Sequence, residues 1–437
     1  MIVLEFKAKG KTTQYSAIDE AIRTAQFVRN KAIRYWMDNQ SASGRSCDSK
    51  AVDARTPNTG VGQKQLYRLS KTLRAEFPFV RALNSSACQA SIERAYSAIA
   101  RFYSNCKKSI PGKKGYPKFK KNCRSVEYKT SGWKLSENRK QIDFIDKKGI
   151  GSLKLKGTWD LNFYQLDQIK RVRLVRRADG YYVQFLISAE NKVDTFLTGK
   201  MIGLDVGIKE FYTDSNGHTE SNPKFYRTGQ KRLKFRQRRV SRKLKGSTNR
   251  RKAINQLGRV HLKISRQREE HACRVARCVI QSNDLVAYED LRIKNLVKNH
   301  CLAKAINDAG WYQFRKWLEY FGVKFGKITV AVNPAYTSQE CSNCSTVVKK
   351  SLSMRTHVCQ CGFILDRDWN AAINILKLAL STTGHVGTWV DDFGVSAQSN
   401  AERSRSIDPN ALGDSTSTLA GAILLGQVGS MNKESPP

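Results

Sequence analysis

Acidic side chains are scarce in this sequence of 437 residues. It contains 37 Asp and Glu against 77 Lys and Arg, which gives a formal net charge of +40 at neutral pH. A chain with so large an excess of one charge repels itself unless a polyanion neutralises it. Because contacts between basic side chains and phosphates release counterions, the imbalance favours a protein that binds RNA or DNA.

Long hydrophobic runs are also missing. No stretch approaches the roughly 18 apolar residues of a membrane-spanning helix, and no Lys/Arg-rich segment has the broad apolar face of a helix that lies on a membrane. The apolar start IVLEF is too short for a secretory signal. The cysteine count is odd, at 11, which argues against a disulfide framework. We therefore expect a cytoplasmic protein without a membrane partner, acting at the nucleoid.

The apolar pattern of the first half changes from helical to strand-like. After a short strand at 2–6, helices are predicted over 16–37, with Ser16 as the N-cap, and over 63–76 and 86–105. A loop rich in Ser, Gly, Asn and Thr is expected at 40–62. Strand-like runs fill 125–190 and end in a hairpin with Asp179 and Gly180 at its turn, as in small antiparallel barrels.

The second half opens with strands at 201–214 and then becomes basic. Between Lys231 and Lys252, 12 of 22 residues are Lys or Arg and none is acidic. Leu233, Val240 and Leu244 form a thin apolar stripe, so a helix is expected, followed by a turn and a second helix over 249–281. Like charges at helical spacing destabilise a lone helix, and a phosphate backbone alongside would remove that repulsion. Further strands are predicted at 284–289 and 327–332, and helices at 309–321 and 368–380.

Three acidic residues stand at the ends of apolar segments. Asp205 follows the strand MIGL, Glu289 ends the strand DLVAYE, and Asp368 precedes the helix WNAAINIL. Each could be an ordinary strand-end or capping residue, and Asp366 is expected to cap or support that helix. The order of Asp on a first strand, Glu on a later strand and Asp at a late helix is more specific, and is expected of an RNase H-like fold. Such a triad can hold two Mg²⁺ or Mn²⁺ ions for phosphodiester cleavage.

Four cysteines cluster late in the chain. Cys341-x2-Cys344 is followed, after fourteen residues, by Cys359-x-Cys361. Two such knuckles match a structural zinc site in a small ribbon. Because the second pair is closer than the usual C-x2-C, His357 stays open as a substitute ligand. The other seven cysteines, at 47, 88, 106, 123, 273, 278 and 301, are interpreted as buried thiols.

Several segments together resemble the TnpB family, the RNA-guided nucleases of bacterial insertion sequences. The resemblance rests on GLDVGIKEF, YEDLRIKNLVKN, the two cysteine knuckles and DRDWNAAINIL, with GKKGYPKFK (112–120) as a further match. It implies a RuvC-like nuclease with an inserted zinc ribbon. It also implies catalytic carboxylates at Asp205, Glu289 and Asp368, and zinc ligands at Cys341, Cys344, Cys359 and Cys361.

The same resemblance implies a multidomain α/β, α and β architecture. Residues 1–15 and 125–195 would form a β-barrel-like wedge domain, 16–124 a helical recognition domain, 200–340 and 362–383 the nuclease, and 341–361 the ribbon. Residues 384–437, rich in Ser, Gly, Ala and Thr, are expected to be a disordered tail. The expected partners are a guide RNA from the transposon end, bound by one protein copy, and double-stranded DNA beside a short target-adjacent motif.

Three alternatives stay open. A compact type V CRISPR effector would share the same nuclease, and the neighbouring DNA would distinguish it. An RNA-guided repressor descended from a nuclease would be expected to lack one of the three carboxylates, all of which are present. A zinc-ribbon DNA-binding regulator would need neither the carboxylates nor so long a body.

Overall fold

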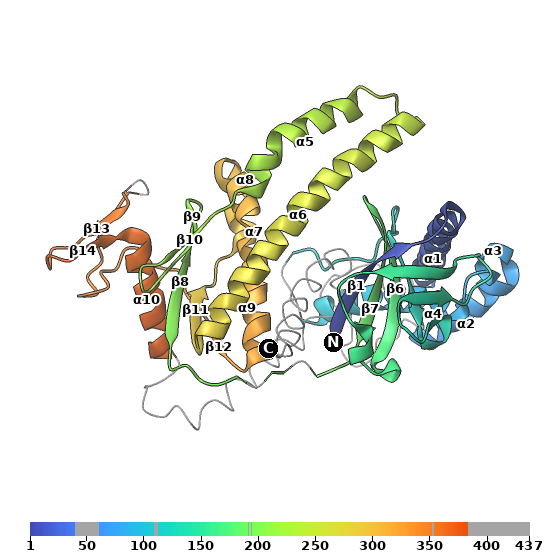
Figure 1. The fold of residues 1–437 in the computed structure, drawn as a ribbon, viewed down its shortest axis with the longest axis horizontal. Coiled ribbons are helices and arrows are strands. Elements are labelled where there is room, and N and C mark those ends of the chain that lie inside the picture. The colour runs from blue at the N-terminus through green and yellow to red at the C-terminus, as the bar shows by residue number, and fades with distance from the viewer. Residues whose placement is uncertain (40–60, 109–111, 191, 194, 352–353, 383–437) are drawn as a thin grey trace, which may run out of the picture. The chain divides into compact units, whose positions relative to one another are not determined.

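The computed structural model (Figure 1) describes residues 1–39, 61–108, 112–190, 192–193, 195–351 and 354–382. The chain divides into two compact units, the first formed by residues 1–190 and the second beginning at Asn191. The expected tail and nearly all of the expected loop at 40–62 lie outside the described residues. Within the described ranges, no helix is long and apolar enough to cross a membrane.

The described residues of the first unit form the helices α1 (Thr12–Asp38), α2 (Gln63–Glu76), α3 (Pro78–Arg81) and α4 (Ser85–Lys107). The N-cap prediction for α1 was wrong. The helix begins four residues before Ser16, whose hydroxyl donates a hydrogen bond to the Thr12 carbonyl inside the first turn. The Gln14 side chain instead accepts the amide hydrogen of Lys11, so the helix start needs no Ser or Asp.

One antiparallel sheet completes the first unit. Its strands are β1 (Ile2–Lys9), β2 (Ser125–Lys129), β3 (Trp133–Leu135), β4 (Gln141–Phe144), β5 (Gly151–Lys156), β6 (Ile169–Arg177) and β7 (Gly180–Ile187). They are ordered β2-β6-β7-β1-β5-β4-β3. The 3₁₀ helices are η2 (Thr130–Gly132), η3 (Leu161–Phe163) and η4 (Leu166–Gln168). Only η2 separates β2 from β3, although these are the two edge strands. Three residues span little distance, so the sheet must curl until its edges approach, as expected of a barrel-like domain.

The predicted β6–β7 hairpin is present. Arg177 pairs with Gly180, which leaves Ala178 and Asp179 as the turn, one residue earlier than expected. Gly180 has φ +138°, a conformation that favours glycine.

The second unit is built on a mixed sheet. Its strands are β8 (Met201–Val206), β9 (Glu210–Asp214), β10 (Thr219–Ser221), β11 (Leu285–Glu289) and β12 (Ile328–Val332), ordered β10-β9-β8-β11-β12. β8 and β9 correspond to the strands predicted at 201–214 and form an antiparallel hairpin, and β11 runs parallel to both β8 and β12. This topology fits the RNase H-like fold expected from the sequence.

The helices of the second unit are α5 (Phe225–Ser241), α6 (Thr248–Ser282), α7 (Ile293–Leu296), α8 (His300–Ala309), α9 (Trp311–Phe325) and α10 (Arg367–Thr382). Helices α6 and α9 cover one face of the sheet, and α10 covers the other. Val286 and Tyr288 pack with α6 and α9, whereas Leu285 and Ala287 pack with α10. Alternating residues of β11 therefore pack into two cores, which explains why the four residues LVAY contain no charged side chain.

Two helix predictions need correction. Leu244 is 80% exposed and lies beyond the end of α5, so the apolar stripe consists of Leu233 and Val240 alone. The helix expected at 309–321 corresponds to α9, and α8 before it was missed. Gly310, with φ +74°, ends α8 and separates the two helices.

A close approach brings α10 onto the sheet. A Cβ atom at Gly203 in β8 would lie 2.2 Å from the Ala372 carbonyl oxygen and 2.8 Å from the Leu376 nitrogen. Only glycine at this position lets the backbone of α10 contact β8. The last two strands, β13 (Thr356–Val358) and β14 (Ile364–Asp366), form a small ribbon between β12 and α10. The start of α10 is thereby fixed beside the carboxyl ends of β8 and β11.

Candidate functional site

Asp205 and Glu289 leave the sheet at the same edge. Leu204 of β8 pairs with Tyr288 of the parallel strand β11, and the two carboxylates come next along their strands. Burial, followed by the negative charges of Glu289 and Asp368, raises the pKa of Asp205 well above its usual value. Carboxylates influence one another in this way only at short range. The fold therefore brings Asp205 into electrostatic range of both Glu289 and Asp368, the other two acidic residues singled out in the sequence.

Glu289 is oriented by a residue that sequence reasoning missed. The Thr337 hydroxyl donates a hydrogen bond of 2.6 Å to Glu289 Oε1. Burial raises the pKa of Glu289, while this hydrogen bond opposes the shift. Thr337 is only 3% exposed and belongs to the segment after β12. No local sequence pattern marks it, because its partner is 48 residues away.

The two aspartates at the start of α10 have different surroundings. Asp366 Oδ1 accepts the backbone N–H groups of Asp368, at 2.9 Å, and Trp369, at 3.2 Å. Asp366 is thus the N-cap, as predicted. Asp368 does not cap and is held by two arginines, with Arg367 Nη2 at 2.8 Å from Oδ1 and Arg355 Nη1 at 3.1 Å from Oδ2. Neither arginine was identified from the sequence.

This carboxylate group fits hard divalent cations. Its side chains offer only oxygen ligands, and the crowding that raises the pKa of Asp205 would be relieved by positive charge. Within the described part of the chain, only the four cysteines form a compact cluster of ligand atoms. The three carboxylates thus lie at one edge of the sheet, but their oxygen atoms do not form a compact cluster, and Asp368 is paired with Arg355 and Arg367.

The four cysteines singled out in the sequence meet in the ribbon. Their sulfur atoms all lie within 4.8 Å of one another, with Cys341 3.8 Å from Cys361 and Cys344 3.5 Å from Cys359. A tetrahedral zinc site with Zn–S bonds of about 2.3 Å requires sulfurs separated by about 3.8 Å. The donor set and spacing therefore fit zinc.

His357 lies outside this cluster. Its ring is fully buried, and its Nδ1 contacts the Lys350 ammonium group. The interpretation of the scattered cysteines as buried thiols was only partly correct. Cys88 and Cys273 are buried, but Cys278 and Cys301 are exposed and Cys106 and Cys123 are half-buried. Cys47 lies outside the described residues.

The predicted basic segment forms part of a cationic groove. α5 and α6 run side by side as an arm that extends beyond the sheet (Figure 1). A hollow of about 590 Å³ between them is lined by Arg232, Arg236, Arg259 and Lys263 and by no acidic residue. Arg236 Nη1 donates to Gln256, whereas its buried Nε has no partner. Two of the four cations come from α6, outside the segment 231–252 identified in the sequence.

Comparisons with known proteins agree with this architecture. A family model described as "Probable transposase" matches residues 184–300, and one described as "Cas12f1-like, TNB domain" matches residues 311–375. The Cas12f1–sgRNA–target DNA complex, solved by cryo-EM, has a TM-score of 0.52 at 14% identity, covering 84% of this chain and 83% of that chain. That likeness shows a shared fold.

Two curated relatives extend over most of the chain. The chain is 28% identical over 279 residues to the putative RNA-guided DNA endonuclease InsQ of Escherichia coli (strain K12), covering 60% of this chain and 68% of that protein. It is 31% identical over 313 residues to a putative RNA-guided DNA endonuclease of Streptomyces pristinaespiralis, covering 70% of this chain and 75% of that protein. With the gathered carboxylates and the four-cysteine ribbon, this similarity shows that the chain belongs to the TnpB family of RNA-guided DNA endonucleases.

Proposed function

We propose that this protein is an RNA-guided endonuclease that cuts double-stranded DNA with Asp205, Glu289 and Asp368. A guide RNA derived from the transposon end would choose the target by base pairing, while the protein reads a short adjacent motif. The observation that carries the proposal is the electrostatic proximity of three acidic residues, from two parallel strands and one helix, at one edge of the sheet. The names of the curated relatives support the same activity.

The three carboxylates would hold Mg²⁺ or Mn²⁺. When bound, a pair of such ions activates a water molecule and stabilises the leaving oxygen of the phosphodiester. The chain itself contributes orientation. Thr337 fixes one oxygen of Glu289, and Asp366 caps α10 so that Asp368 is free of the helix amides. The Arg355 and Arg367 guanidinium groups neutralise Asp368 and lie where a phosphate would need positive charge.

The four cysteines would hold a structural zinc ion. Four sulfur ligands leave no open position for chemistry, so the ribbon's contribution is mechanical. It fixes β14, whose last residue, Asp366, directly precedes α10.

The cationic groove between α5 and α6 supports nucleic-acid binding. Four basic side chains line one hollow whose described lining contains no acidic residue, and such a concentration of positive charge attracts a phosphate backbone. Guide RNA is the proposed resident partner, bound in the cytoplasm by a single copy of the protein.

The proposal is tested by replacing each carboxylate separately with alanine. Asp205→Ala, Glu289→Ala and Asp368→Ala should each abolish guided cleavage, while binding of guide RNA and target persists. Sequencing of RNA that co-purifies with the protein identifies the guide for this assay. Normal cleavage by any one variant would remove that residue from the proposed site, and the absence of bound RNA would contradict RNA guidance.

A further inference from the structure

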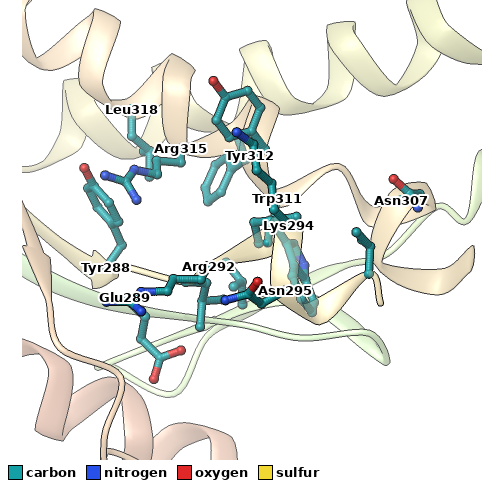
Figure 2. A pocket seen from close by; sticks show the side chains of 15 residues that line it. Tyr288, Glu289, Arg292, Lys294, Asn295, Asn307, Trp311, Tyr312, Arg315 and Leu318 are labelled. Carbon is teal, nitrogen blue, oxygen red and sulfur yellow. The ribbon is translucent and has the colours of Figure 1, made fainter. Parts of the chain in front are cut away.

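A pocket of about 690 Å³ opens beside Glu289 (Figure 2). Its lining begins with Val206, Tyr288 and Glu289 at the ends of β8 and β11 and continues through residues 291–297 to α9. The Glu289 carboxylate points out of one side of the pocket, and Trp311 and Tyr312 lie across it. The volume is typical of ligand sites.

The floor of the pocket is apolar and fixed to the strand that carries Asp205. Val206, Leu291, Ile293 and Val297 pack around the buried Trp311. The Trp311 indole N–H donates a hydrogen bond of 3.3 Å to the Gly207 carbonyl, two residues beyond Asp205. The floor and the carboxylate group are therefore parts of one rigid arrangement.

Two aromatic rings form the wall. Tyr312 is 55% exposed, and the Lys316 ammonium lies 5.1 Å from the centroid of its ring. The Tyr288 ring has the Arg315 guanidinium 5.5 Å from its centroid. An exposed tyrosine on an ordered helix, with a cation beside it, is a suitable platform for stacking a flat ring.

The charges at the rim differ in how they are paired. Arg315 is bound by Asp290 and, at 2.8 Å, by Glu319, so its charge is neutralised. Arg292 and Lys294 are exposed, and neither pairs with a carboxylate within the described chain. Apolar floor, aromatic wall and free cations together match the chemistry of a nucleotide, which has an apolar base and an anionic phosphate.

We propose that this pocket receives an unpaired nucleobase of the DNA strand that is being cut, one or a few nucleotides from the scissile phosphate. A strand whose phosphate reaches Glu289 must pass this edge of the sheet. Only an unpaired base exposes its flat face and can enter, since bases in a duplex are already stacked. Tyr312 would stack on the base, and Arg292 and Lys294 would contact its flanking phosphates. The inference rests on the proposed nuclease function and adds to it a base-binding pocket beside Glu289.

The experiment combines a change in the protein with a change in the DNA. Guided targets are prepared with one abasic nucleotide at successive positions around the cut site, and single-turnover cleavage is measured with wild type, Tyr312→Ala and Tyr312→Phe. Tyr312→Ala should slow cleavage of normal DNA about tenfold, on the scale of one base–aromatic stack, whereas Tyr312→Phe keeps the ring and the rate. At one position, the abasic nucleotide should slow cleavage by wild type as much as Tyr312→Ala slows cleavage of normal DNA. The same abasic target should not slow cleavage by Tyr312→Ala any further. Additive effects at every position would overturn the proposal.

A binding measurement separates this inference from the catalytic proposal. The Asp205→Ala variant with guide RNA is bound to targets carrying 2-aminopurine at the same positions, and fluorescence reports stacking. Addition of Tyr312→Ala should change the signal at one position, while Val323→Ala, at an exposed site of α9 outside the pocket, should not. If Tyr312→Ala weakens guide-RNA binding instead, RNA occupies the pocket and the proposal is wrong. If wild type does not cleave but the fluorescence change is seen, only the catalytic proposal fails.

Discussion

The Arg355 guanidinium lies 3.1 Å from the Asp368 carboxylate and links the ribbon to the first turn of α10. Arg367 binds the other oxygen of the same carboxylate at 2.8 Å. Asp368 is therefore neutralised by protein cations in the absence of metal ions. A divalent ion that uses Asp368 must compete with these arginines.

Removal of Arg355 should strengthen metal binding. The side chain is 52% exposed, so its ion pair contributes at most about 1 kcal/mol, or about fivefold in affinity. We expect Arg355→Ala to lower the Mg²⁺ concentration for half-maximal cleavage by up to about that factor. Arg34→Ala, which breaks the exposed pair of Arg34 with Asp38 in the first unit, is the control. An unchanged or higher half-saturation concentration would contradict the competition. The maximal rate is a separate readout, and its loss would show that Arg355 also contacts the substrate.

Asp205→Asn should stabilise the metal-free protein while abolishing cleavage. Burial and the neighbouring carboxylates raise the folded-state pKa of Asp205, so the folded state binds this proton more tightly than the unfolded state. The resulting stabilisation is complete below the ordinary aspartate pKa of about 4 and is lost as pH rises through the raised pKa. At neutral pH, ionisation of Asp205 therefore destabilises the folded wild-type protein, and the neutral asparagine side chain removes this destabilisation.

Thermal unfolding in EDTA at several pH values tests this expectation. We expect Tm of Asp205→Asn to exceed that of wild type at pH 7 by a few degrees, since about 1 kcal/mol shifts Tm by about 2–4 °C in a domain of this size. The difference should shrink in acid and when Mg²⁺ is added, because either neutralises the wild-type charge. A lower Tm of the variant at neutral pH would show that Asp205 is stabilised by a partner.

Zinc content should follow the cysteines and not His357. Elemental analysis is expected to give about one zinc per chain for wild type and close to none for Cys344→Ser or Cys361→Ser. His357→Gln should keep its zinc, because the four sulfurs already complete a tetrahedral set without the imidazole. Zinc loss in His357→Gln, with retention in Cys361→Ser, would identify the histidine as the fourth ligand.

The groove between α5 and α6 should determine part of the salt dependence of RNA binding. Arg259→Gln together with Lys263→Gln removes two cations of its lining. The slope of log K against log salt is negative, and each lost phosphate contact should make it less steep by about 0.7–0.9. We also expect RNA affinity to fall about tenfold. Arg274→Gln, an exposed arginine of α6 outside the groove, is the control. Equal slopes for wild type and the double variant would exclude the groove as a phosphate site.

The parts of the site that depend on local patterns could be predicted from the sequence. Asp205 and Glu289 end apolar strands, and strands that run parallel bring such ends to one edge. The two cysteine knuckles depend on short spacings, and Asp366 caps α10 through the two amides that follow it. In each case the residues that make the contact are near one another in the chain, or the geometry of a sheet aligns them.

The residues that were missed act over long distances. Thr337 reaches Glu289 across 48 residues, and Arg355 reaches Asp368 only because the ribbon folds back. The pocket beside Glu289 needs strand ends and α9 to meet, so no single segment reveals it. The N-cap at Ser16 was wrong for a different reason. A glutamine side chain caps α1, and glutamine carries little positional information about helix starts.

The ribbon is connected to α10 without a linker residue. β14 ends at Asp366 and α10 begins at Arg367, while Asp366 also holds the first amides of the helix. A rotation of the ribbon must therefore also rotate the first turn of α10, because no flexible residue separates the two. Asp368, in that turn, would shift relative to Asp205 and Glu289, which are anchored in the sheet.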